Sequence, residues 1–151
     1  RTESDQLHYN LHIILRFELE MALIDGRLQV EDLKSAWDSR FEALFGYAPR
    51  NLEESFLQDP HWALGEFGYF PTYALGNVYA ACFFEAIEKE VPEYSRALEE
   101  GNTHEVRAWL KTHVHQHGQS RSASDLLSGA CENPVSIDPL VDYLRRMFVP
   151  N

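Results

Sequence analysis

The chain has 151 residues, of which 44% are hydrophobic and 13% aromatic, so it can bury a core and is not a disordered tail. It carries 13 Lys and Arg against 24 Asp and Glu, a formal net charge of −11, which disfavours nucleic acid and anionic membranes as partners. Its two cysteines, Cys82 and Cys131, do not form a CxxC pair. Two scattered thiols fit a reducing compartment, so we expect a cytoplasmic protein.

The chain begins with Arg1 rather than Met, and a strongly periodic segment follows almost at once, without a signal segment. This start is typical of a piece of a larger protein. No run of 18 apolar residues occurs, so we expect no membrane span.

Helical patterns dominate the start of the chain. Ser4 or Asp5 can cap a helix that runs to about Ile24, and its apolar residues cover most of the circumference, which predicts a buried helix. A second helix is expected over residues 30–45, with a narrower apolar stripe and Gly46 as its stop.

The middle of the chain changes character. Residues 47–70 have no helical period and contain several Pro and Gly. An irregular connection of this length in a compact domain is typically functional or packed against another part of the protein. Pro71 then opens a helix to about Glu90, and apolar residues nearly encircle it, which predicts a second core helix.

The remaining residues predict shorter helices over residues 93–99 and 103–117, from Ser122 or Ser124 to about 131, and over 138–148. Strand alternation and internal repeats are not evident. The sequence therefore predicts an all-α chain, residues 1–151 forming one unit with several helices around two nearly fully buried ones.

A row of polar residues interrupts the first helix at a spacing of four: His8, His12, Arg16 and Glu20. Such a row follows one side of a helix. An unpaired guanidinium is very costly to bury, so Arg16 must pair, meet a ligand or face a wet cleft. One interpretation is an internal ion pair with Glu18 or Glu20. The other is an anion-binding arginine, whose fork suits a carboxylate.

The irregular stretch gathers groups that could carry chemistry: Gln58, Asp59, His61, Trp62, Tyr69 and Tyr73. A His and two Tyr around a turn that enters a buried helix could donate hydrogen bonds to a developing oxyanion. A packed loop whose aromatic rings only fill space is the alternative interpretation.

Three histidines, His113, His115 and His117, suggest a metal site, since the first and last are four apart and could bind one divalent ion. The segment also ends a helix, where His complements the helix dipole, and it has no thiolate and few carboxylates nearby. We therefore expect no metal ion to be bound by this chain.

Three strings in the chain resemble one known family: NLHIILRFELE (residues 10–20), LQDPHWALGEFGYFPTYALGN (57–77) and HVHQHG (113–118). They are similar to the C-terminal third of the thermostable carboxypeptidases of the carboxypeptidase Taq type, over nearly the whole chain. The family consists of all-helical, usually dimeric, metal-dependent exopeptidases with an HExxH motif. Ser55 stands where the family has Gly, and the acidic pair that the family has near Glu20 is not matched exactly.

The chain itself has no HExxH motif. The resemblance places the family's third metal ligand, the Glu of a His-Glu-Ser string, upstream of Arg1. It implies a parent protein in which a divalent metal, zinc or cobalt, polarises the scissile carbonyl while the Glu of HExxH takes a proton from water.

The resemblance also implies roles for residues that the chain does contain. Arg16 would hold the free C-terminal carboxylate of a peptide substrate, which makes the enzyme an exopeptidase. His61 would hydrogen-bond the substrate or its oxyanion, and Tyr69 or Tyr73 would donate to the tetrahedral intermediate, so these three are the candidate catalytic residues. The other candidate substrate-binding and loop-fixing residues are His12, Gln58 and Asp59.

Two functions remain open at this point. The chain is either the C-terminal substrate-binding portion of a metallocarboxypeptidase, inactive alone, or a non-enzymatic helical module that binds peptides or a partner chain. In the first case its partners would be peptide C-termini and the missing N-terminal part of the same protein. The two helices that are apolar nearly all round also predict self-association. A histidine-cluster metal protein is a third reading that rests only on residues 113–117.

Overall fold

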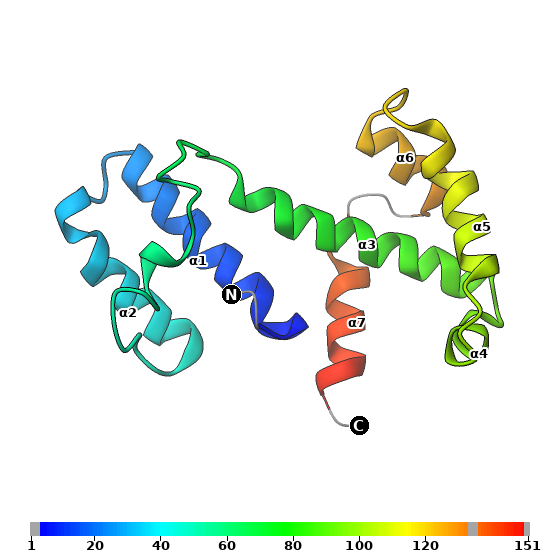
Figure 1. Ribbon diagram of the computed structural model, residues 1–151, viewed down its shortest axis with the longest axis horizontal. Helices are drawn as coiled ribbons and strands as arrows, with labels where there is room; N and C mark the ends of the chain where they lie inside the picture. Colours follow the sequence, from blue (N-terminus) through cyan, green and yellow to red (C-terminus); the bar gives the residue numbers. More distant parts are fainter. Residues whose placement is uncertain (1–3, 133–135, 150–151) are drawn as a thin grey trace. The chain divides into compact units, whose positions relative to one another are not determined.

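The structure is a computed structural model that describes residues 4–132 and 136–149. All regular elements in those residues are α-helices or 3₁₀ helices, and no strand occurs there, which confirms the all-α prediction. The α-helices are α1 Gln6–Ile24, α2 Leu33–Phe45, α3 Phe70–Glu90, α4 Tyr94–Glu99, α5 His104–His113, α6 Ala123–Ala130 and α7 Asp138–Phe148 (Figure 1). Short 3₁₀ turns occupy Val30–Asp32, Phe56–Gln58 and His115–His117.

Local sequence signals account for the start of α1 and the end of α2. Asp5 caps α1, because its carboxylate accepts a hydrogen bond of 2.8 Å from the backbone N–H of His8. Helix α2 ends at Gly46, whose φ of +79° lies in the left-handed region that favours glycine. The helix expected over residues 103–117 stops earlier, because Val114 leaves the helical range (φ −126°, ψ −65°) and a 3₁₀ turn follows.

The contacts group into two compact units, Arg1–Leu75 and Gly76–Asn151, where the sequence predicts one. In the first unit α1 and α2 pack side by side, and the loop between α2 and α3 lies against them (Figure 1). Its core consists of Leu15, Leu19, Leu33, Trp37 and Phe41. This core makes α1 a fixed support for the residues of the loop.

The second unit contains most of α3 together with α4 to α7. Its buried core consists of Ala86, Ile87, Val91, Trp109 and Ala130. Cys82 and Cys131 are free thiols, and burial raises the pKa of the Cys131 thiol to about 11, so little reactive thiolate forms there at neutral pH. None of the helices in the described ranges, 4–132 and 136–149, is long and apolar enough to cross a bilayer.

Helix α1 is buried on one side only, whereas its composition predicts burial nearly all round. The buried side carries Ile13, Leu15, Arg16, Leu19 and Glu20. The other side carries an exposed apolar stripe. Its residues are spaced by seven, three, four and three positions, so they share one helical face: Leu7, Ile14, Phe17, Met21 and Ile24. Helix α3 likewise exposes Leu75. Composition reveals that a face is apolar, but it does not reveal how much of that face this chain itself covers.

We expect the chain to self-associate through the exposed apolar stripe of α1, because contiguous apolar surface of this kind promotes association. Sedimentation at micromolar concentration should show species larger than a monomer, and Phe17→Asp should shift the distribution toward the monomer. A strictly monomeric chain that binds no dye for apolar surface would contradict this prediction.

Candidate active site

Arg16 lies on the buried side of α1, with only 1% of its side chain exposed. Its Nε donates to Oδ2 of Asp59 at 2.6 Å, its Nη1 to the backbone carbonyl of His12 at 2.9 Å, and its Nη2 to Oε1 of Gln58 at 3.3 Å. The guanidinium carbon lies 4.9 Å from the ring centroid of Trp37. The buried charge is thus paired with a carboxylate and lies over an aromatic ring.

The carboxylate that contacts Arg16 belongs to Asp59, 43 residues away, although helix spacing suggested Glu18 or Glu20. Glu18 is exposed and accepts two hydrogen bonds from Arg40, at 2.6 and 2.9 Å. Glu20 accepts hydrogen bonds from the loop before α3. Arg16 therefore forms an internal ion pair, but with Asp59 rather than with Glu18 or Glu20.

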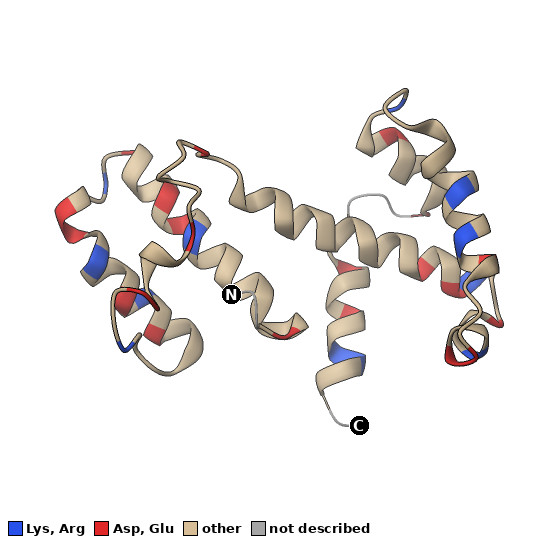
Figure 2. Ribbon diagram, in the orientation of Figure 1, with Lys and Arg blue, Asp and Glu red and all other residues tan. Residues whose placement is uncertain are grey.

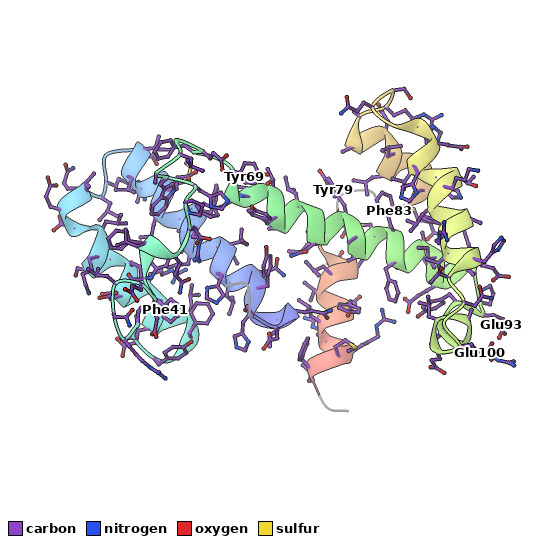
Figure 3. The ribbon with its side chains drawn as sticks, viewed as in Figure 1. Phe41, Tyr69, Tyr79, Phe83, Glu93 and Glu100 are labelled. Atoms are coloured by element: carbon purple, nitrogen blue, oxygen red, sulfur yellow. The ribbon has the colours of Figure 1, made fainter. Side chains whose placement is uncertain are left out.

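The structure brings His61, Tyr69 and Tyr73 together at the start of α3, where Figure 3 labels Tyr69. Nε2 of His61 lies 3.1 Å from the hydroxyl of Tyr73, and the two tyrosine rings are 5.4 Å apart between centroids. His61 is 6% exposed, whereas Tyr69 is 46% exposed. In this arrangement His61 orients the hydroxyl of Tyr73, and the Tyr69 ring is open to solvent.

The His61 ring packs against an apolar neighbour. The His61 ring lies 4.6 Å from the ring of Phe70, and its Nδ1 is buried with no hydrogen-bond partner among the described residues. Helix α3 carries no Lys, Arg, Asp or Glu between Phe70 and Phe84 (Figure 2). A tyrosine hydroxyl can donate a hydrogen bond to a developing negative charge, and such a bond becomes stronger when a bound substrate excludes water.

His12 lies one turn before Arg16 on α1, with its ring 4.4 Å from that of Phe45. Burial, and then the positive charge of Arg16, lower the pKa of His12 from 6.5 to about 4, so this histidine is neutral at pH 7. His12 and Gln58 both line a pocket of about 410 Å³ in the first unit. The pocket places two of the candidate substrate-binding residues next to the buried ion pair.

The lowered pKa of His12 predicts a stability that depends on pH. Between pH 6.5 and 4 the unfolded chain binds a proton at His12 that the folded chain does not, so stability is complete above pH 6.5 and falls as the pH approaches 4. We expect a loss of about 2–3 kcal/mol over that window. Urea unfolding of the native chain and of His12→Gln at pH 7 and pH 4.5 measures it. An equal loss in both proteins would show that His12 is not the cause.

Two residues that support the site, Glu20 and Trp62, were assigned no role in it from the sequence. Glu20 is 2% exposed and binds the loop before α3, and the indole of Trp62 is one of its partners. The available signal was the position of Glu20, because it shares the four-residue row with Arg16 on an otherwise apolar helix. A second carboxylate on a buried row needs a partner as much as the arginine does.

The histidines at the end of α5 are arranged for packing. His113 stacks on Trp109 with 4.4 Å between ring centroids, and its Nε2 lies 3.7 Å from a carboxylate oxygen of Glu90. His115 and His117 belong to the 3₁₀ turn that follows. Across the described ranges no group of three His, Cys, Asp or Glu side chains could hold a metal ion.

Similarity to known proteins places these features in a family. The family model described as Carboxypeptidase Taq (M32) metallopeptidase matches residues 1–148. The chain belongs to this family. The all-α structure and the loop before α3 described above therefore belong to a member of the M32 family.

The relatives of this M32 chain are considerably longer than it is. Carboxypeptidase 1 of Bacillus subtilis is 40% identical over 98% of this chain, and Thermostable carboxypeptidase 1 of Thermus thermophilus is 38% identical over 98%. The structure of an M32 carboxypeptidase from Deinococcus radiodurans R1 has a TM-score of 0.92 and 34% identity over 97% of this chain. A Pyrococcus furiosus carboxypeptidase structure has a TM-score of 0.93 and 32% identity over 98%. The chain spans about 30% of the length of each of these relatives.

Proposed function

We propose that residues 1–151 form the C-terminal, substrate-facing part of a metal-dependent carboxypeptidase that releases C-terminal amino acids from peptides. The family match over residues 1–148 carries this proposal, because the relatives are carboxypeptidases by name. The partners of the chain are then peptide C-termini and the remaining part of the same protein. A reducing cytoplasm, suggested by the two free thiols, is the proposed location.

The tyrosines have the roles closest to the substrate in this proposal. The exposed hydroxyl of Tyr69 and the hydroxyl of Tyr73, which His61 orients, donate hydrogen bonds to the oxygen of the scissile carbonyl as negative charge develops on it. His61 acts through Tyr73, because its own ring is buried. The ion pair of Arg16 with Asp59 holds the loop in place against α1.

The remaining candidate residues support binding. His12 and Gln58 line the pocket beside the ion pair, where the neutral His12 ring offers a polar atom without adding charge. The divalent ion of the complete enzyme, zinc or cobalt, belongs to the proposal, and so does a dimeric state. The described residues offer no three-ligand group for that ion, so its ligands belong to other parts of the protein in this proposal.

The isolated chain of residues 1–151 should release no amino acid from a blocked dipeptide, with or without added zinc or cobalt, because its sequence has no HExxH motif. A longer protein that contains this chain and an HExxH segment should release the C-terminal amino acid, and a chelator should abolish that release. The assay is amino-acid release followed over time.

Chelator-sensitive release by the isolated chain would contradict the predicted inactivity. If the longer protein is also inactive while residues 1–151 bind peptides in calorimetry, the non-enzymatic peptide-binding module replaces the enzyme as the better reading of this chain.

A further inference from the structure

The carboxylate of Glu20 binds two points of the loop before α3. Its Oε2 accepts a hydrogen bond from Nε1 of Trp62 at 2.7 Å, and its Oε1 accepts one from the backbone N–H of Gly68 at 2.6 Å. The side chain itself is 2% exposed. A buried carboxylate is costly unless its oxygens are satisfied, and here each oxygen has a donor from the same loop.

The two contact points lie directly next to the candidate catalytic residues. Trp62 follows His61 in the chain, and Gly68 precedes Tyr69. Gly68 has a φ of +79°, a conformation that a side chain would disfavour, and its N–H is bound to the helix in this conformation. The backbone on both sides of the loop tip is therefore tied to one carboxylate of α1.

The segment between these two points is stiffened by its own backbone hydrogen bonds. The N–H of Leu64 donates to the carbonyl of Pro60 at 2.9 Å, and the N–H of Glu66 donates to the carbonyl of His61 at 2.8 Å. These hydrogen bonds restrain the backbone of the loop, so attaching the loop at Trp62 and Gly68 also restrains the residues between them. Arg16 holds Asp59 just before it, which provides a third attachment to α1.

We propose that Glu20 is a positioning residue for catalysis: by binding Trp62 and Gly68 it sets the placement of His61 and Tyr69 relative to α1. This inference rests on the proposed carboxypeptidase function. Glu20 does not touch substrate; it acts through the loop. A displacement of about 1 Å at the catalytic groups can cost on the order of a hundredfold in rate, so the positioning has a large effect on turnover.

The test uses the longer protein with the HExxH segment and compares Glu20→Gln with the native form. In glutamine an NH2 group replaces one carboxylate oxygen and would face an N–H donor of the loop with another donor, so the loop loses one attachment. We expect kcat on a blocked dipeptide to fall about ten- to a hundredfold while KM stays within about twofold. Thermal unfolding of both proteins shows whether the variant is folded at the assay temperature, so that a lower kcat is not caused by unfolded enzyme.

Glu18→Gln is the matched control, because Glu18 lies on the same helix, pairs with Arg40 at the surface and belongs to no part of the loop. We expect its kcat to equal that of the native enzyme. If Glu20→Gln does not fold, Trp62→Phe removes one N–H donor and keeps an aromatic ring, and it should lower kcat in the same way by a smaller factor.

The outcomes separate the two proposals. In one outcome the native enzyme is active, and Glu20→Gln or Trp62→Phe has the same kcat as Glu18→Gln. This result overturns the positioning role and leaves the carboxypeptidase function standing. A fall in kcat/KM that comes from KM alone also overturns it, because the loop would then serve binding. A native longer protein that releases no C-terminal amino acid overturns the proposed function itself, and the positioning role with it.

Discussion

Replacing Arg16 with alanine should lower the free energy of unfolding by about 3–5 kcal/mol, because it leaves a buried carboxylate without its partner. Asp59, at 2.6 Å from Arg16, would keep its charge in a largely buried place, and Gln58 would lose a donor. Denaturant unfolding followed by helical circular dichroism measures the loss. The double variant Arg16→Ala with Asp59→Ala should lose less than the sum of the two single losses, because it removes both charges.

Arg40→Ala is the matched control for this experiment. Arg40 also binds a glutamate of α1 through two hydrogen bonds, but both side chains are exposed, so its loss should cost less than about 1 kcal/mol. In the longer protein, Arg16→Ala should weaken the binding of free-carboxyl and amidated peptides by the same factor. A loss confined to free-carboxyl peptides would show that Arg16 contacts the substrate carboxylate after all.

Replacing Trp109 with alanine should destabilise the second unit by about 3–5 kcal/mol, the usual cost of removing a buried aromatic ring. The Trp109 ring stacks on His113 and meets Phe83 at 6.1 Å between centroids, and its Nε1 donates to Glu90 at 2.9 Å. The deletion therefore removes core packing and one side-chain hydrogen bond together. The denaturant midpoint of Trp109→Ala against the native chain is the measurement.

Trp109→Phe separates the two contributions to that loss. Phenylalanine keeps a ring that can stack on His113 but cannot donate to Glu90, whose side chain is half exposed and can bind water instead. We expect this variant to lose about 1 kcal/mol. If Trp109→Ala lost no more than Trp109→Phe, the ring would not be a core element of the second unit.

The helices could be predicted closely because their ends depend on residues close in sequence. Asp5 and Gly46 act within a few residues of the helix ends that they cap, and Pro71 fixes the entry to α3. Val114 is an exception, since it leaves the helical range without a recognisable stop signal in the sequence. Local chemistry of this kind is readable in a single sequence.

The partners in the site could not be predicted in the same way. Helix spacing offers Arg16 only neighbours within one turn, whereas its carboxylate partner comes from a loop 43 residues away. The grouping of His61 with two tyrosines was suggested because all three lie near one turn, but the burial of His61 was not, since burial depends on the helix against which the loop packs. Distant contacts of this kind leave a polar residue on an apolar helix as their only trace in sequence.

The boundary between the two compact units falls within a single continuous helix, between Leu75 and Gly76 of α3. Extending an existing helix by a residue requires far less free energy than nucleating a new one, so whichever unit forms its part of α3 first lowers the nucleation barrier for the other. Gly76 works against this coupling, because a glycine inside a helix costs about 1 kcal/mol relative to alanine. Propagation of α3 from one unit into the other thus has to pass a residue of low helix propensity.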